Sequence, residues 1–286
     1  KDEPEYRAAK KNIVLWQGSE DFAVLNHKST FSPATIKSLR SQIKYFSSEN
    51  SLVDCAIIDD NGESRVILDP QNRNIEICKI SDLLIVGRHN LENVAAAAIV
   101  ADIMKVPVEI IREAVKRFVG LPHRLELVRE INKVKYINDS FATSPDPTMA
   151  AINSFDNAKV LILGGSSKGA DFTELAEMIA GTNVESIVLI GVEGPKIRKV
   201  LKSADYDGRL VSGGDSIEKI VGKASVEADR GDVVLFSPAC ASFDMFKNYK
   251  VRGDKFREAV LKLNPNVEIR NPKQIKNLKN SKFKTF

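Results

Sequence analysis

The chain has 286 residues, 43% hydrophobic and 28% charged, a composition typical of a soluble globular protein long enough for two domains. No apolar run reaches the roughly 18 residues that cross a bilayer, and three widely spaced cysteines argue against a disulfide framework or zinc site and for the reducing cytoplasm. The net charge of +4 includes five lysines and no acid within residues 271–286, so the rest carries 4 − 5 = −1, which argues against a nucleic-acid-binding body.

The first residues predict a short helix, a strand and a hairpin. Residues 5–13 (EYRAAKKNI) predict the helix, on which Lys10 reads by periodicity alone as an ordinary solvated lysine. Residues 22–26 (FAVLN) predict a strand. Residues 53–69 predict a β-hairpin, because Asn61-Gly62 supplies the positive φ angles of its turn.

Two helices follow, at residues 89–104 and 107–120. Asn90 and Asn93 lie three residues apart at the first helix start and therefore share a face. Their amides could match the donor and acceptor edge of an adenine, although the local pattern alone favours helix capping. Gly120-Leu121-Pro122 ends the second helix and predicts a domain boundary.

His123 and Arg124 follow this boundary directly. An arginine at a hinge could bind nucleotide phosphates, and an interdomain salt bridge explains it equally well. His123 has no cluster of partners beside it in the sequence and is interpreted as structural.

The second half alternates apolar strands with helices, which predicts βαβ units and a mainly parallel sheet. One of these helices is expected to begin with Asp215 as its N-cap. Ligands of such sheets bind at the carboxyl ends of the strands. Polar clusters follow three of the predicted strands, at residues 138–144, 164–168 and 237–242.

The last two clusters have no complete catalytic motif. Lys168 precedes Gly169, so the loop is not a Walker phosphate loop, and the lysine could hold a carboxylate or phosphate or simply be exposed. Ser237 and Ser242 could donate to a carboxylate, but no histidine stands near them and a Ser–His–Asp triad has little support. Cys240, between alanines, is interpreted as a buried small residue.

The ordered set of motifs resembles the Mur ligases, and within them the branch that adds D-glutamate. The resemblance runs from about Tyr6 to about Leu263 and is most specific in its last motif. The motifs are YRAAK, GRHNLEN, GLPHRLE, YINDSFATSPDPTMAAI, LILGGSSKGADF and SPACASFDMFKNYKVRG.

The resemblance implies an α/β fold. Residues 1–122 would be the C-terminal portion of a central ATP-binding domain, residues 123–268 a Rossmann-like C-terminal domain with a mainly parallel sheet, and residues 269–286 a basic tail. It also implies a monomeric cytoplasmic ligase that uses ATP and Mg²⁺. Through an acyl phosphate, this ligase would join D-glutamate to UDP-N-acetylmuramoyl-L-alanine in peptidoglycan synthesis.

Residue roles carry over by motif. Lys10 matches a lysine that is carbamylated and supports the metal site, since a carbamate offers Mg²⁺ the oxygen ligands that an ammonium cannot. Four residues match nucleotide-binding positions: Asn90, Asn93, Arg124 and Asp139. Five match positions that line the D-glutamate pocket: Thr143, Lys168, Ser242, Phe243 and Tyr249. The catalytic candidates are Lys10, Lys168 and Thr143.

The chain departs from the family pattern twice. Phe141 stands where relatives often carry a lysine, so another residue supplies the positive charge or the acceptor geometry differs. No GKT phosphate loop, catalytic glutamate or metal-binding histidine precedes Lys10, so the 286 residues alone are expected to lack ligase activity. The alternatives are another Mur ligase or a folylpolyglutamate synthase-like ligase with a different amino acid, and a non-catalytic nucleotide-binding module.

Overall fold

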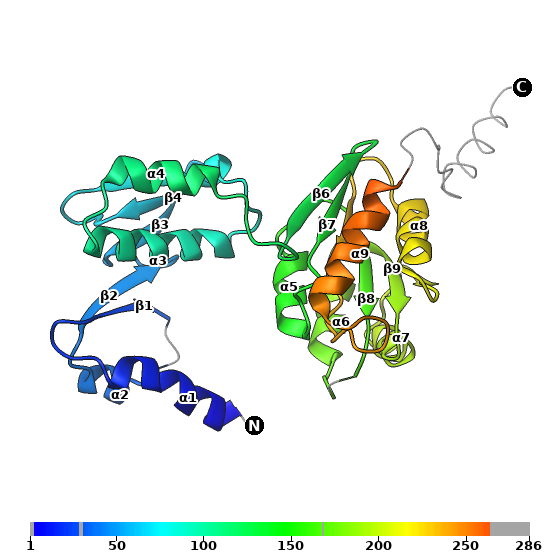
Figure 1. The fold of residues 1–286 in the computed structure, drawn as a ribbon, viewed down its shortest axis with the longest axis horizontal. Helices are drawn as coiled ribbons and strands as arrows, with labels where there is room; N and C mark the ends of the chain where they lie inside the picture. The colour runs from blue at the N-terminus through cyan, green and yellow to red at the C-terminus, as the bar shows by residue number, and fades with distance from the viewer. Residues whose placement is uncertain (1–2, 29–30, 168, 264–286) are drawn as a thin grey trace, which may run out of the picture. The chain divides into compact units, whose positions relative to one another are not determined.

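The computed structural model describes residues 3–28, 31–167 and 169–263, which form two compact units, Lys1–Val119 and Gly120–Phe286 (Figure 1). Lys168 and the predicted basic tail lie outside the described residues. The predicted α/β class is confirmed, since both units combine a sheet with helices. None of the helices in the described ranges combines the length and apolarity needed to cross a bilayer.

The first unit is built on a five-stranded sheet in the order β1-β2-β3-β4-β5. Strands β1, β2 and β3 are parallel to one another, and β4 is antiparallel to both of its neighbours, β3 and β5. The predicted hairpin is confirmed, because β3 and β4 are antiparallel and Asn61 and Gly62 both have positive φ. The elements are α1 (Glu3–Leu15), β1 (Phe22–Asn26), α2 (Pro33–Ser38), β2 (Gln42–Ser47), β3 (Cys55–Asp60), β4 (Glu63–Leu68), β5 (Ile75–Lys79), the 3₁₀ helix η1 (Ile80–Asp82), α3 (His89–Ile103) and α4 (Val108–Arg117).

Helix α3 covers this sheet because its sequence is rich in alanine and therefore packs closely. Its buried side chains join Cys55 and Cys78 in one apolar cluster with residues of β3, β4 and β5. Helix α4 adds Ile111 to the same cluster and ends at Arg117. Phe118, inside the predicted range of 107–120, follows the helix and is 47% exposed.

The second unit contains a six-stranded sheet in the order β10-β9-β8-β11-β7-β6, in which only β6 is antiparallel. The mainly parallel sheet was therefore predicted correctly. Its elements are β6 (Glu126–Ile131), β7 (Val134–Asn138), α5 (Pro145–Ile152), β8 (Lys159–Gly164), α6 (Thr173–Ala180), β9 (Val184–Ile190), α7 (Gly194–Ser203), β10 (Arg209–Ser212), α8 (Ile217–Glu227), β11 (Val233–Phe236) and α9 (Tyr249–Leu261).

Helices cover both faces of this sheet, which explains why its central strands are apolar throughout. Along β8, Leu161 and Leu163 pack against α5, α6 and α7, whereas Val160 and Ile162 pack against α8 and α9. Helix α8 begins with Ser216, whose Oγ accepts from the Lys219 backbone N–H at 3.4 Å, so the predicted Asp215 cap is wrong by one residue.

Candidate functional site

Three loops meet at the carboxyl edge of the second sheet. Strands β7, β11 and β8 are parallel neighbours, so the polar clusters that follow them start side by side, as the sequence predicted. Backbone bonds join the loops: Asp139 N–H donates to Phe236 O at 2.8 Å, and Ser166 N–H donates to Ala241 O at 2.9 Å. The Phe243 N–H donates to Ser166 Oγ at 3.1 Å. The edge is therefore one connected surface rather than three separate turns.

Asp139 is buried in this surface and is 4% exposed. Its carboxylate accepts from Ser237 Oγ at 2.7 Å and from the Leu125 backbone N–H at 3.2 Å. Burial raises the pKa of Asp139 to about 6, against the opposing effect of the Ser237 hydrogen bond. Ser237, which was predicted to donate to a carboxylate, thus donates to one within the protein.

Arg252 on α9 binds two of the loops together. Although it is 1% exposed, its Nε donates to Ser140 Oγ at 3.0 Å and its Nη2 to Ser140 O at 2.9 Å. Its Nη1 donates to Cys240 O at 3.0 Å and to Ala241 O at 3.1 Å. Burial lowers the Arg252 pKa to about 10, so the side chain stays cationic at neutral pH. The guanidinium fork therefore fixes the loop after β7 against the loop after β11.

Cys240 accepts one of these bonds through its carbonyl, while its thiol is buried. Burial raises the pKa of the Cys240 thiol to about 12, so it is not a thiolate at neutral pH. This agrees with the interpretation of Cys240 as a small buried residue.

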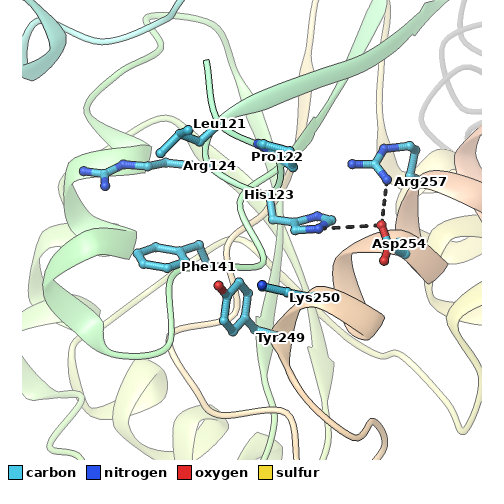
Figure 2. Close-up of a pocket in the computed structure, with 9 residues that line it drawn as sticks. All are labelled: Leu121, Pro122, His123, Arg124, Phe141, Tyr249, Lys250, Asp254 and Arg257. Atoms are coloured by element: carbon cyan, nitrogen blue, oxygen red, sulfur yellow. Dashed lines mark hydrogen bonds and ion pairs between the residues drawn. The ribbon is translucent and has the colours of Figure 1, made fainter. Parts of the chain in front are cut away.

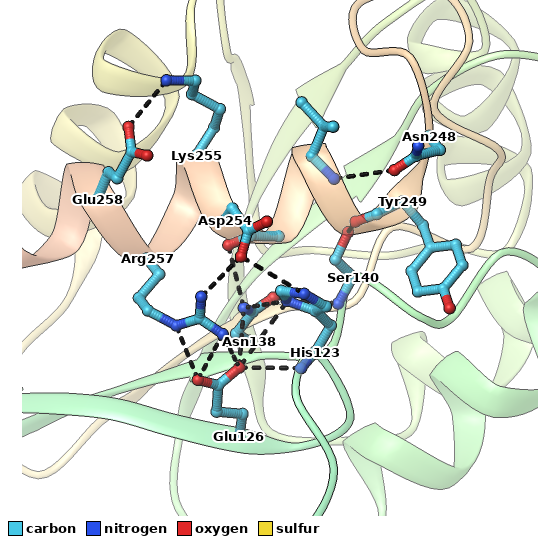
Figure 3. Close-up of polar contacts among 12 residues, drawn as sticks. His123, Glu126, Asn138, Ser140, Asn248, Tyr249, Asp254, Lys255, Arg257 and Glu258 are labelled. Carbon is cyan, nitrogen blue, oxygen red and sulfur yellow. Dashed lines mark hydrogen bonds and ion pairs between the residues drawn. The ribbon is translucent and has the colours of Figure 1, made fainter.

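His123 is buried and lies in a second polar cluster that the sequence did not reveal (Figure 3). Its Nδ1 lies 3.1 Å from Asn138 Nδ2, and its Nε2 lies 3.6 Å from Asp254 Oδ1. Because the Asn138 amide nitrogen can only donate, Nδ1 must accept, which places the imidazole proton on Nε2, facing Asp254. Burial lowers the pKa of His123, which favours this neutral form.

Arg257 also belongs to this cluster. It makes two bonds of 2.9 Å to the carboxylate of Glu126 and one of 2.7 Å to Asp254. Glu126 in turn accepts the His123 backbone N–H at 2.9 Å and Asn138 Nδ2 at 3.2 Å. The partners of His123 therefore come from β6, β7 and α9. They form a cluster only in the folded chain, because none stands directly beside His123 in the sequence.

A pocket of about 490 Å³ opens beside this cluster, entirely within the second unit (Figure 2). Phe141 and Tyr249 form an edge-to-face pair with ring centroids 5.2 Å apart, and the Arg124 guanidinium lies 5.8 Å from the centroid of the Phe141 ring. The volume lies within the usual range for small-molecule sites. The lining residues are Leu121, Pro122, His123, Arg124, Phe141, Tyr249, Lys250, Asp254 and Arg257.

The predicted site residues divide between the two units. Lys10 is exposed on α1. Asn90 and Asn93 lie in the first turn of α3, where Asn90 Nδ2 donates to Val86 O at 2.7 Å and Asn93 Nδ2 donates to Asn90 Oδ1 at 3.0 Å. The capping alternative is wrong, because Arg88 is the N-cap of α3 and its side chain makes no capping hydrogen bond there.

The remaining predicted residues belong to the second unit. Arg124 and Tyr249 line the pocket, whereas Thr143, Ser242 and Phe243 lie on the strand-end loops and are not among its described lining residues. Ser242 is buried and Phe243 is 71% exposed. Lys168 lies outside the described residues.

The residues that the sequence analysis missed are Arg252, Glu126, Asp254, Arg257 and Lys250. Glu126 ends the quoted motif GLPHRLE, and Lys250 and Arg252 stand in the last quoted motif, where Arg252 is followed by Gly253. A Cβ on Gly253 would lie 2.3 Å from His123 Nδ1, so this glycine makes room for the histidine.

Two protein-family models match the chain, the Mur ligase middle domain over residues 1–101 and the Mur ligase glutamate ligase domain over residues 123–240. A UDP-N-acetylmuramoylalanine--D-glutamate ligase of Acetivibrio thermocellus is 42% identical over 264 residues, covering 90% of this chain and 55% of that protein. The chain thus spans about half the length of the curated relatives it matches.

Solved structures share the fold at lower identity. The MurF ligase of Thermotoga maritima in complex with ADP has a TM-score of 0.61 at 17% identity, over 91% of this chain and 58% of that one. The bifunctional folylpolyglutamate synthase/dihydrofolate synthase of Yersinia pestis complexed with AMPPNP and Mn ion has a TM-score of 0.59 at 19% identity, over 92% and 57%.

Proposed function

The chain belongs to the Mur ligase family, and from this premise we propose that it is part of an ATP-dependent ligase that adds D-glutamate to UDP-N-acetylmuramoyl-L-alanine. The observation that carries the proposal is the 42% identity to a D-glutamate ligase, which extends over both units. The reaction would take place in the cytoplasm, on a monomer, during peptidoglycan synthesis.

The proposed chemistry has two steps. ATP transfers its γ-phosphoryl group to the carboxylate of the UDP-linked substrate, which gives an acyl phosphate and ADP. The amine of D-glutamate then attacks the acyl carbon, the amide bond forms and inorganic phosphate leaves with the bonding electrons. The proton that the amine loses passes to a base.

On this proposal Arg124 binds nucleotide phosphate, since its side chain is exposed at the pocket and its planar guanidinium carries a fixed fork of donors. Asp139 would receive the ribose hydroxyls. A carboxylate offers about four acceptor positions, so the two bonds from Ser237 and Leu125 leave capacity for a hydroxyl. Asn90 and Asn93 would bind the adenine.

The acceptor amino acid would lie on the strand-end loops. Thr143, Ser242 and Lys168 would hold its carboxylates, and the rings of Phe243 and Tyr249 would border its methylene groups. The connected loops and the Arg252 fork support this assignment, because they fix the backbone that carries Ser242.

Mg²⁺ is proposed as the metal of the reaction, with Lys10, once carbamylated, supporting its site. Within the described ranges, no three side chains of the His, Cys, Asp and Glu types come together as a metal cage.

An acceptor assay tests the proposal. Phosphate release by the protein from the complete gene is measured with UDP-N-acetylmuramoyl-L-alanine and ATP, with D-glutamate, L-lysine, meso-diaminopimelate or L-alanine as acceptor. Release that depends on D-glutamate is expected, and preference for another acceptor would overturn the proposal in favour of a sister ligase. The 286 residues alone contain no G-x-x-x-x-G-K-[ST] motif and are expected to release no phosphate.

A further inference from the structure

The pocket of the second unit carries more positive than negative charge, and the surplus lies at one end. Three cations line it, Arg124, Lys250 and Arg257, and one acid, Asp254. Arg257 is already paired with Asp254 and, through two bonds, with Glu126 outside the pocket. With both acids counted, three positive charges face two negative ones.

Lys250 and Arg124 carry this surplus. Among the described residues neither side chain has a hydrogen bond or ion pair recorded, and the Arg124 guanidinium instead lies over the Phe141 ring. Asp254 is occupied by Arg257 at 2.7 Å, and His123 faces the same carboxylate at 3.6 Å. The one acid among the lining residues is therefore committed to other partners.

The aromatic pair lies at the same end. Figure 2 shows the amine of Lys250 near Tyr249 and turned away from Asp254. In the same view Arg124 lies above Phe141. Phe141 is 46% exposed and Tyr249 is half-buried, so their rings present an apolar surface to the pocket. Two cations beside an exposed aromatic surface suit a ligand with an apolar body and an anionic end.

We propose that Lys250 is a further substrate-binding residue, which together with Arg124 holds an anionic oxygen group of a ligand seated against Phe141 and Tyr249. The group is a carboxylate of the acceptor amino acid or a phosphate of the nucleotide, which share this chemistry. The inference rests on the proposed ligase function. Lys250 would also supply a positive charge to a pocket in which position 141 contributes a phenyl ring.

Charge-removal variants of the protein from the complete gene test the inference. Lys250→Gln removes the cation, Lys250→Arg keeps it, and Lys255→Gln removes a cation from the same helix at a side chain that pairs with Glu258 instead of lining the pocket. KM and kcat are measured for the acceptor amino acid and for ATP, using whichever acceptor the wild-type protein prefers.

Lys250→Gln is expected to raise one KM by about tenfold, the loss of one charge-assisted hydrogen bond, with kcat within about twofold of wild type. A rise in the acceptor KM identifies a carboxylate, and a rise in the ATP KM identifies a phosphate. Lys250→Arg should retain most of the affinity and Lys255→Gln should match wild type. Both KM values unchanged in Lys250→Gln, or an equal rise in Lys255→Gln, would overturn the inference. A wild-type preference for an acceptor other than D-glutamate would overturn the proposed function and leave this comparison valid.

Discussion

Replacing Arg252 by methionine should loosen the loops at the carboxyl edge of the second sheet. Methionine keeps an unbranched apolar side chain beside the Phe236 ring, whose centroid lies 5.9 Å from the Arg252 guanidinium carbon, while removing every donor. The arginine makes four hydrogen bonds, to Ser140 Oγ, Ser140 O, Cys240 O and Ala241 O. Since these acceptors lie in two different loops, the substitution removes the connection between the loops as well as the bonds.

The cost follows from the acceptors that remain without a donor. The Ala241 carbonyl keeps the Ser166 backbone N–H, whereas no other donor is recorded for the carbonyls of Ser140 and Cys240 in the described part of the chain. Each buried carbonyl left unpaired costs about 1–3 kcal/mol. Removing a buried cation offsets part of this cost. A loss of about 3 kcal/mol in the free energy of unfolding is expected, and about 1–2 kcal/mol for Arg252→Lys, whose ammonium cannot form the fork.

Urea unfolding followed by circular dichroism measures the stability, and hydrogen exchange of residues 138–144 and 237–242 measures the loops. Both segments should exchange faster in Arg252→Met. Arg198→Met is the matched control, because Arg198 is half-buried on α7 and makes one bond, of 3.3 Å, to Leu210 O. Its expected loss is below about 1 kcal/mol. If Arg252→Met unfolds with the stability of the control and its loops exchange at the wild-type rate, the fork does not hold this edge together.

Two further substitutions probe the same unit. Asp139→Asn should change how the free energy of unfolding depends on pH. The folded-state pKa of about 6 lies above the ordinary 3.8, so between these pH values the wild-type protein binds more protons folded than unfolded. The wild-type protein therefore loses stability as the pH rises through this range. Urea unfolding at pH 4 and pH 7 should show wild type losing up to about 3 kcal/mol relative to the variant, and parallel pH profiles would contradict this. Gly253→Ala places a Cβ 2.3 Å from His123 Nδ1 and should destabilise by about 1–3 kcal/mol, whereas Gly222→Ala on α8, with no atom within 4 Å of its Cβ, should be neutral or stabilising by up to about 1 kcal/mol. Thermal unfolding compares the two, and equal effects would show that the space beside His123 is not restricted.

The sequence predicted the central strands of the second sheet because their burial on both faces leaves a purely apolar pattern. It did not predict β2, β5, β6 or β10. These strands are half-exposed or lie at an edge of their sheet, so their sequences mix polar and apolar residues, as in QIKYFS and ELVREI. Their strand structure depends on pairing with neighbours and not on local pattern.

The site was predictable to the same extent as the sheet. Polar residues that directly follow buried parallel strands converge, so the sequence located the three loops. The cluster around His123 could not be found in this way, because Glu126 and Arg257 are 131 residues apart in the chain and meet only after α9 packs beside β6 and β7. No periodicity connects residues at that separation.

In the stretch that begins at the end of β7, the buried residues are bonded within the protein and the exposed residue borders the pocket. Asn138, Asp139 and Ser140 are buried and bonded to His123, Ser237 and Arg252 respectively. The next residue, Phe141, is 46% exposed and borders the pocket. Asn138 and Ser140, two of the polar residues that suggested a site, therefore hold its backbone in place. If the pocket binds the ligand as proposed, the choice of ligand should respond more to substitutions at Phe141 and Lys250 than to conservative changes at Ser140.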